Sequence, residues 1–389
     1  MYIPTKMKRF IPYILSLSAV ITASCVKEDP NGIIQPDPEV TPKPDPKPEQ
    51  QAAVSFSSIM QEEISSTRTG ANTRAPQGLN KDFVVYGYKM SDNSSQIVFD
   101  GYNVTYNANS SGTSEDNSHN YSYVGEKSIN DITQEIKYWD YSATEYRYWG
   151  YVKNDEKISP SDNGKTLTIK DLNLGITEPE GYLISSLKVV PTADFGKVVQ
   201  LEFIRPYAKV RVMFYSGEKL EDDDTIELSK ITFGPSDESK IPAQGKVTVG
   251  YPLDKSAKAE TYTVTDVEAS RKSCFDYSAT AVKPLILDKD HCSTSTAIAA
   301  TPTTGSSGEY YYVLPVSTGA TPPSYTLSVS VDGDDELRTA VIPATFMNWK
   351  ANYSYTYIFK ILEGGLIFVD AKVEDWKPGG AGNDEWRNW

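Results

Sequence analysis

Apolar and polar residues alternate with a period of two along most of the chain, which is typical of β-strands with one buried face. Strands are predicted where this alternation is bounded by turn-forming residues. They span residues 53–60, 82–90, 93–107, 198–206, 207–215, 226–234, 245–253, 261–267, 310–317, 324–333, 336–346, 352–365 and 366–376. No long amphipathic helix is predicted.

Many short strands separated by frequent turns predict an all-β protein built from β-sandwiches. The chain after residue 52 is long enough for two domains of ordinary size. The acidic turn that follows Tyr215 is a natural boundary between them. We therefore expect domains at 53–215 and 216–389.

The stretch IKYWDYSATEYRYWGYV, residues 136–152, holds seven Tyr or Trp residues among seventeen. Its alternation predicts a β-hairpin, in which aromatic pairs across the strands stabilise the sheet. We expect Tyr138, Trp139, Tyr148 and Trp149 to build the first sandwich. Binding of carbohydrate or of a host surface by the exposed members is the alternative.

The start of the chain is basic, and an apolar run follows over residues 10–21. This run is too short to span a bilayer of about 30 Å, and it is typical of a secretory signal peptide. Small residues then precede Cys25, in an order that resembles a bacterial lipobox, with Thr22 where Leu is usual. We expect a signal peptide over 1–24 and lipidation of Cys25, and ordinary cleavage near Ala23 is the alternative.

Residues 25–52 are predicted to form a linker between the lipidated end and a folded body. Residues 30–50 alternate Pro with charged residues, which favours an extended, polyproline-like spacer. The Lys and two acidic residues at 27–29 resemble the surface-export signal of some Gram-negative lipoproteins. A solvated charge cluster is the alternative for those three residues.

The chain carries a formal net charge of −14 and nothing in it suggests a basic face, so nucleic acid is not expected as a partner. No CxxC, HExxH, GxSxG or GxGxxG pattern occurs, and the two histidines are far apart in sequence. The acidic clusters at 221–224 and 332–336 lack the spacing of an EF-hand and are expected to be solvated turns. We expect no cofactor, no metal site and no enzymatic activity.

Besides Cys25 the chain has two cysteines, Cys274 and Cys292. In an exported protein they are able to form a disulfide, which would stabilise the fold by about 3 kcal/mol if it is unstrained. Two free thiols are the alternative.

Several segments, taken in order, resemble the fimbrillins, the subunits of type V pili. The resemblance extends over nearly the whole chain. It rests on the leader ending at Cys25, the strand AVSFSSIM at 53–60, Thr73-Arg74-Ala75 before the strand at 83–88, the Trp/Tyr stretch, FIRPYAKVRV at 203–212, YYYVLPVS at 310–317, the Trp and Tyr run at 349–357 and VEDW at 373–376.

Membership of that family implies two Greek-key-like, transthyretin-like β-sandwich domains and a defined assembly route. The precursor travels to the cell surface as a lipoprotein. A trypsin-like protease then cuts after an Arg and removes the lipid, the linker and the first strand. The vacated groove accepts a strand from the next subunit.

The residues that match this scheme lie at both ends of the body. Val54 and Phe56 alternate with serines, as a groove-filling strand requires. Arg74 is the expected cleavage site because of its Thr-Arg-Ala context, and Arg68 is the second candidate. The candidate donor strand is 366–376, whose alternate apolar residues are expected to share one face: Ile367, Val369, Ala371 and Val373.

The expected function is a structural or adhesive subunit of fimbriae on the outer membrane of a Gram-negative bacterium. The expected partners are other fimbrillin subunits, the processing protease, the outer membrane through the lipid, and host or microbial surface ligands. One alternative is a surface lipoprotein that never polymerises and acts as an anchor or adhesin. The other is a glycan-binding lipoprotein of a nutrient-uptake system.

Overall fold

A computed structural model of the chain describes residues 52–60, 78–92, 94–108, 117–118, 120–153, 157–237, 241–271, 275–276, 284–301 and 309–375. Their regular elements are β-strands and three short 3₁₀ helices, η1 (Thr192–Asp194), η2 (Thr294–Thr296) and η3 (Ala344–Met347). The predicted all-β fold class is therefore confirmed. None of the helices in these residues is long and apolar enough to cross a membrane.

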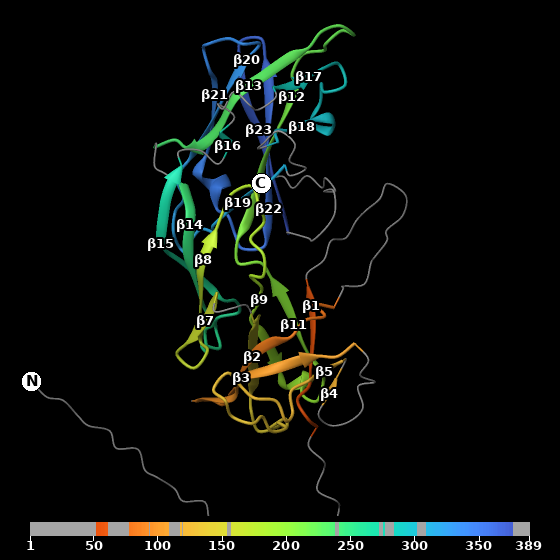
Figure 1. Ribbon diagram of the computed structural model, residues 1–389, viewed down its shortest axis with the longest axis vertical. Coiled ribbons are helices and arrows are strands. Elements are labelled where there is room, and N and C mark those ends of the chain that lie inside the picture. The colour runs from red at the N-terminus through yellow and green to blue at the C-terminus, as the bar shows by residue number, and fades with distance from the viewer. Residues whose placement is uncertain are drawn as a thin grey trace, which may run out of the picture. The chain divides into compact units, whose positions relative to one another are not determined.

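The first sheet gathers strands from the N-terminal half of the chain (Figure 1). Its order is β1 (Phe56–Met60), β11 (Val199–Ile204), β9 (Ile184–Ser185), β6 (Glu145–Val152), β2 (Phe83–Met90), β3 (Ser95–Tyr106), β5 (Tyr121–Ser122) and β4 (Asn117–Ser118), with β10 (Lys188–Pro191) paired to β6. The strands β1 and β11 run parallel, and the other pairs in this sheet are antiparallel.

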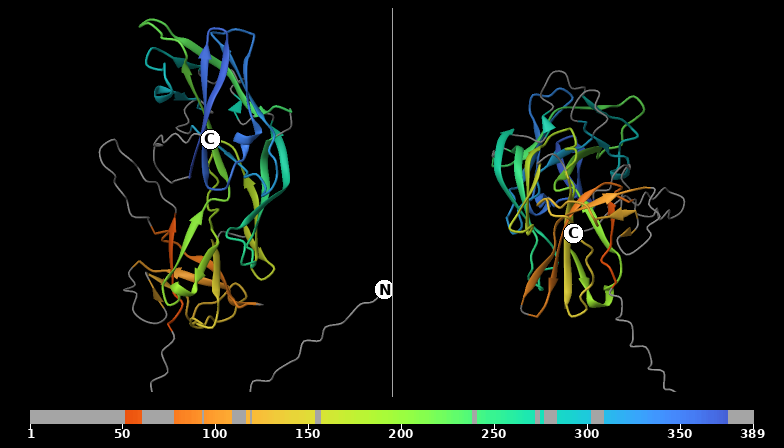
Figure 2. Two further views of the ribbon diagram at one scale, coloured as in Figure 1. Left: turned by 180° about the vertical axis from the view of Figure 1, so that it is seen from behind. Right: turned by 60° about the horizontal axis from the view of Figure 1, so that its bottom comes forward.

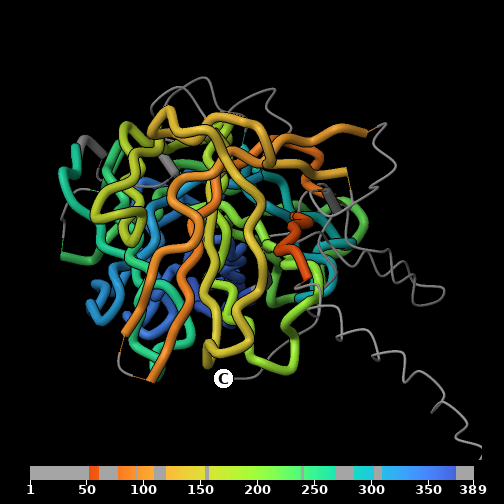
Figure 3. Tube along the Cα trace, turned by 90° about the horizontal axis from the view of Figure 1, so that it is seen from below, coloured from red at the N-terminus to blue at the C-terminus, as the bar shows by residue number. Residues whose placement is uncertain are grey.

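The centre of the first sheet is buried on both faces. Nearly every residue of β2 and β6 is buried, and β2 lies between β6 and β3 (Figure 3). One face packs in a core that includes Tyr86 and Trp149, and the other packs in a core that includes Phe56, Phe99 and Tyr148. This double burial explains why aromatic residues occupy consecutive positions of β6.

The second sheet covers one face of the first and joins strands from both halves of the sequence. Its order is β15 (Thr261–Arg271), β14 (Ile241–Gly250), β8 (Thr166–Asn173) and β7 (Ile158–Ser161). The strands β7 and β8 were not predicted, and β8 pairs with β14 across the expected domain boundary after Tyr215. That boundary stays a prediction.

The third and fourth sheets enclose the remaining core (Figure 2). The third has the order β18 (Ile298–Ala299), β12 (Ala208–Ser216), β22 (Tyr353–Leu362) and β23 (Gly365–Asp375), with β19 (Tyr311–Val313) also paired to β12. The fourth has the order β16 (Phe275–Asp276), β13 (Ile226–Pro235), β20 (Tyr325–Val331) and β21 (Arg338–Ile342), with β17 (Leu285–Leu287) paired to β13. Strand β12 thus belongs with the C-terminal sheets.

The aromatic stretch 136–152 forms a regular strand only in its second half, β6. Residue Tyr138 makes an isolated bridge with Ala53 instead of pairing with β6, so the predicted hairpin is wrong. Its expected role in the core is confirmed for Trp139, Tyr148 and Trp149, each 0% exposed. It is wrong for Tyr138, which is 38% exposed.

Candidate strand-exchange site

Strand β1 is hydrogen-bonded along one edge to β11. The two strands run parallel, with Phe56 opposite Val199 and Met60 opposite Phe203. Just before β1 begins, the backbone N–H of Val199 donates to the carbonyl of Ser55 at 2.8 Å. One edge of the chain is therefore paired with β11 from Ser55 to Met60.

The other edge of the same segment is held by residues 137–139. The N–H of Val54 donates to the carbonyl of Lys137 at 2.8 Å, and the N–H of Trp139 donates to that of Ala52 at 3.0 Å. Residues 137–139 thus bond to this segment, while the two edges of β6 are paired with β2 and β10. The segment 52–60 is inserted between two parts of the chain rather than laid on its surface.

Alternate side chains of this segment point into the core. The exposed fractions of Val54, Phe56 and Ser58 are 0%, 1% and 4%, whereas Ser55 and Ser57 are half-buried. The predicted alternation of groove-filling and outward residues therefore matches the burial of the strand in place.

Phe56 lies at the centre of an aromatic cluster. Four rings meet it edge-on, with centroid distances of 5.1 Å for Phe99, 5.8 Å for Tyr148, 5.9 Å for Tyr123 and 6.5 Å for Phe83. Such edge-to-face pairs contribute about 0.5–1.5 kcal/mol each beyond the burial of their area. The cluster makes Phe56 the main side-chain anchor of β1.

Two tyrosine hydroxyls hold β1 from the opposite wall. The hydroxyl of Tyr121 lies 2.6 Å from Ser58 Oγ, and that of Tyr123 donates to the carbonyl of Val54 at 2.8 Å. Burial raises the pKa of the Tyr121 hydroxyl above its ordinary value of 10.0. Both tyrosines were missed by sequence reasoning, since the short alternation Tyr-Ser-Tyr at 121–123 is their only signal.

Removal of residues 52–60 would open a groove lined by this cluster. The backbone groups of β11 that face β1 would lose their partners, and the rings around Phe56 would lose an apolar contact. Both losses are reversed only by another extended strand with apolar residues at alternate positions. The site can therefore take a β-strand as its ligand.

The chain before the segment 61–77 lies next to the chain that follows it. Ile59 near the end of β1 and Gly78 form an isolated antiparallel bridge. The segment contains Arg68 and Arg74 and lies outside the described residues. A break of the chain at either arginine would leave β1 attached to the body by non-covalent contacts alone.

The candidate donor strand is β23, an edge strand of the third sheet among the described residues. It pairs antiparallel with β22, but the register shifts between Ile358 and Phe359. Their partners are Asp370 and Phe368, so Val369 is an extra residue in the ladder. A β-bulge of this kind changes the face on which the following side chains lie.

The bulge divides the apolar face that the sequence predicts. Ile367 and Val369 are 46% and 39% exposed, whereas Ala371 is 1% exposed and Val373 packs half-buried against the C-terminal core. The four side chains therefore do not share one face while the strand is paired with β22. Whether the strand acts as a donor stays a prediction.

Of the three cysteines, only Cys292 lies within the described residues. It is half-buried, and its Sγ donates to the carbonyl of Asp288 at 3.7 Å. Cys25 and Cys274 lie outside the described residues. The lipidation of Cys25 and the pairing of Cys274 with Cys292 stay predictions.

The two acidic clusters form turns whose carboxylates pair with lysines. Asp222 lies 2.6 Å from Lys289 Nζ, and Asp335 lies 3.2 Å from Lys230 Nζ. Within the part of the chain that the structure describes, no group of three or more His, Cys, Asp or Glu could hold a metal ion. These ion pairs are the expected behaviour of solvated turns.

No protein-family model and no curated protein matches the chain. Among solved structures, a fimbrial protein from Bacteroides vulgatus is similar, with 13% identity and a TM-score of 0.43 over 83% of this chain and 99% of that one. A fimbrial assembly protein from Parabacteroides distasonis is similar as well, with 13% identity and a TM-score of 0.34 over 82% and 94%. At such low TM-scores and identities these names carry no functional argument by themselves, so function has to be inferred from the residues of this chain.

Proposed function

We propose that this chain is a structural or adhesive subunit of a surface fimbria, assembled by the exchange of a β-strand. The observation that carries the proposal is the placement of β1. This strand fills an aromatic groove, and the described residues on either side of the segment 61–77, Met60 and Gly78, are both paired. One cut there separates the strand from the body without breaking any described element.

In this proposal the precursor is anchored through a lipid on Cys25 and is carried to the outer membrane. A trypsin-like protease cuts after Arg74, or after Arg68, within the segment between β1 and β2. The lipid, the linker and β1 then leave together. The mature body keeps the groove and gains the ability to bind a strand of another subunit.

The donor strand is 366–376 of the neighbouring subunit. As an edge strand, β23 has only one ladder to break, the one with β22. Its bulge at Val369 depends on that ladder, because register is set by the strand that pairs. In a new ladder the alternation can be restored, which would put Ile367, Val369, Ala371 and Val373 on one face.

The resulting contact is head-to-tail, because the donor strand and the groove are different surfaces. A contact of this kind does not close on itself and builds a filament. The partners are therefore other copies or related fimbrial subunits. An adhesive contact with a host or microbial surface would use the two exposed rings of the aromatic stretch, Tyr138 and Tyr141, which are 38% and 57% exposed.

The assembly experiment compares cut and uncut protein. Wild type treated with a trypsin-like protease should form SDS-resistant ladders on gels. The double variant Arg68→Ala with Arg74→Ala should stay monomeric, because its groove keeps its own strand. Val369→Asp should also block ladders, since a charge without a partner would enter the groove at a cost of several kcal/mol.

If the cut wild type stays monomeric at high concentration, polymerisation is refuted and a tethered lipoprotein that acts as an anchor or adhesin takes its place. If ladders form and Val369→Asp leaves them unchanged, the donor assignment is wrong while strand exchange stands.

Anchoring is tested separately with Cys25→Ser. The thiol is the acceptor of the lipid, so this variant should not be labelled by a palmitate analogue in cells, whereas the wild-type precursor should be labelled. Equal labelling of the two proteins would refute the lipidation of Cys25.

A further inference from the structure

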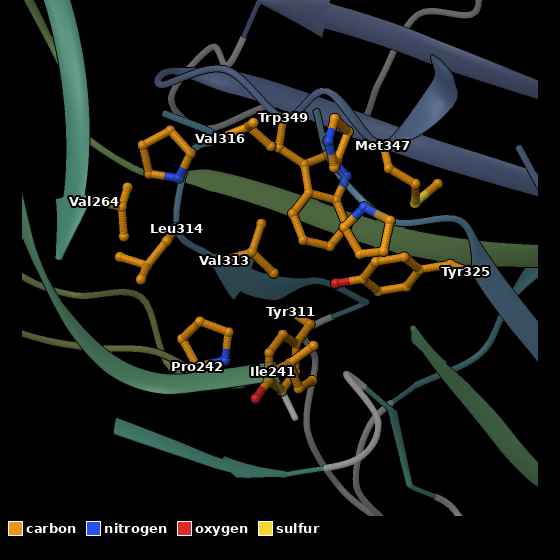
Figure 4. Close-up of a pocket in the computed structure, with 13 residues that line it drawn as sticks. Ile241, Pro242, Val264, Tyr311, Val313, Leu314, Val316, Tyr325, Met347 and Trp349 are labelled. Carbon is orange, nitrogen blue, oxygen red and sulfur yellow. The ribbon is translucent and has the colours of Figure 1, made fainter. Parts of the chain in front are cut away.

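A pocket of about 200 Å³ opens where the second sheet meets the third and fourth sheets (Figure 4). It lies apart from the β1 groove, and its lining comes from β14, β15, β19, β20 and the loops around them. Its walls include Val264, Tyr311, Leu314, Pro323, Tyr325 and Trp349.

The lining of this pocket is apolar and rich in ring-containing side chains. It contains four prolines, two tyrosines and one tryptophan among thirteen residues, and no charged side chain. The N–H of Trp349 already donates to the hydroxyl of Tyr357 at 2.9 Å, so its ring can offer contact but no further hydrogen bond. A sugar would find no charged or amide side chain for its hydroxyls here, whereas an aromatic ring would be accommodated.

The pocket can be reached from solvent. Pro323 is exposed, and Pro242, Val264 and Val316 are half-buried. An apolar cavity of about 150 Å³ is known to take up benzene, so one of about 200 Å³ is large enough for a single aromatic side chain. The pocket is thus sized for one side chain rather than for a large ligand, which usually needs about 300 Å³ or more.

The segment 376–389 contains such side chains and starts close by. It carries three of the six tryptophans of the chain, at 376, 386 and 389. It follows Asp375, the last residue of β23, which pairs with Tyr353. Tyr353 is four residues from Trp349, and four extended residues span about 14 Å at most.

The reach of the segment exceeds this distance. Paired strands lie about 5 Å apart, so the pocket lies within about 20 Å of Asp375. Trp386 follows Asp375 by 11 residues, which can span about 36–40 Å when extended. A ligand tethered this closely has an effective concentration in the millimolar range, so a weak contact is enough to fill the pocket.

We propose that the segment 376–389 folds back on its own chain and inserts the side chain of Trp386 into this pocket. Trp386 is preceded by Asp384 and Glu385, and Lys350, the exposed residue that follows the pocket-lining Trp349, carries the opposite charge. That opposite charge favours Trp386 over Trp389, which is preceded by Arg387 and Asn388. Insertion of Trp386 covers the apolar lining of the pocket and restrains the C-terminal end of β23.

The first test uses the fluorine resonance of Trp349 to detect whether the pocket is occupied. The full chain is labelled with 5-fluorotryptophan, and the fluorine resonance of Trp349 is assigned with Trp349→Phe. Trp386→Ala should shift that resonance, because the side chain that contacts it is removed. Trp389→Ala should leave it in place. A shift with Trp389→Ala instead, or no shift with either, overturns the assignment.

The second test blocks the pocket and measures the solvent exposure of Trp386 from its fluorine resonance. Val264→Phe narrows the pocket from β15, and Val267→Phe is the matched control on the same strand, where Val267 is 42% exposed and does not line the pocket. The Trp386 resonance should lack a shift between H₂O and D₂O in wild type and in the control. It should gain that shift in Val264→Phe. An unchanged resonance in Val264→Phe overturns the proposal.

Dilution separates this arrangement from insertion into a second copy. Docking within one chain leaves the Trp386 resonance independent of protein concentration. A resonance that moves to the solvent-exposed position on dilution would show that the pocket takes the segment of another chain, and it would overturn the intramolecular assignment. If Val264→Phe fails to fold, the tail variants still decide, since their substitutions lie after β23.

Discussion

Strands β1 and β23 lie near the two ends of the described body and are packed in contrasting ways. The segment that contains β1 is paired on both edges, and Phe56 is surrounded by four rings. Strand β23 is paired only with β22 and leaves Ile367 and Val369 exposed. One strand is enclosed by the fold and the other lies at its border.

The comparison shows that the packing of a strand and its covalent connection to the body are independent of each other. β1 contributes buried aromatic and aliphatic contacts, but a single cut in 61–77 would remove its covalent link to the body. β23 stays covalently joined through its turn to β22, and its outward face is available to another chain. A protein that exchanges strands needs both kinds, since the groove has to bind strongly and the donor has to be accessible.

The largest expected effect is that of Phe56→Ala in the uncut chain. Loss of a fully buried aromatic ring should lower the free energy of unfolding by about 3–5 kcal/mol. Urea denaturation measures this value, and Ser57→Ala, a half-buried outward position, should change it by less than about 0.5 kcal/mol. A loss below about 1 kcal/mol would show that the ring cluster does not depend on β1.

A control on the other face of the first sheet sharpens this result. Trp149 stacks on Tyr251 at 4.9 Å and donates to the carbonyl of Gly164 at 2.7 Å, away from β1. Trp149→Ala should also lower stability by about 3–5 kcal/mol. After protease treatment, however, only Phe56→Ala should speed the release of the cut N-terminal fragment.

The next effect compares two positions of β23. Ala371→Asp would bury a carboxylate in the C-terminal core without a partner and should lower the free energy of unfolding by about 3 kcal/mol or more. Val369→Asp lies at the exposed bulge and should change it by about 0.5 kcal/mol or less in the monomer. Equal losses at the two positions would contradict the register of β23.

An alkaline pH should weaken the groove around β1. Burial raises the pKa of Tyr121 and of Tyr148 above the ordinary value of 10.0. Below pH 10 both the folded and the unfolded chain keep these protons, so this contribution to stability is complete. Above pH 10 the unfolded chain loses them first, and stability should fall as the pH rises.

Urea denaturation between pH 9 and pH 11 measures this loss, and Tyr148→Phe is the control. The Tyr148 hydroxyl is buried and has no hydrogen-bond partner among the described residues, so its removal should cost little at neutral pH. The variant should also lose less stability than wild type as the pH rises. A stability that is constant from pH 9 to pH 11 would refute the role of these hydroxyls.

The smallest effect is expected from Ser58→Ala. This change removes the hydrogen bond to Tyr121, which lies 2.6 Å away, and should lower the free energy of unfolding by about 0.5–1.5 kcal/mol. The double variant Ser58→Ala with Tyr121→Phe should lose less than the sum of the two single losses, because each single change already removes the hydrogen bond between these two hydroxyls. Additive losses in the double variant would mean that the two groups do not interact.

The sequence by itself determined where most strands lie and which side chains of β1 point inward. The prediction for 53–60 matches the burial of Val54 and Phe56, and the predicted strands at 82–90, 207–215 and 226–234 agree with β2, β12 and β13 to within one residue at each end. These features depend on alternation along one stretch of chain, which is a local property. The predictions of a leader and of cleavage at Arg74 or Arg68 rest on sequence patterns of the same local kind, and they stay predictions.

Tertiary structure decided which strands pair and which faces they bury. Residues 137–139 could have paired with β6 next to them, but they hold the segment before β1, and β8 pairs with β14 from the other half of the chain. The ladder with β22 places the bulge at Val369 and turns Ile367 outward. No local pattern carries this information, because a strand offers the same backbone donors and acceptors to every partner, and the choice depends on how the distant side chains pack together.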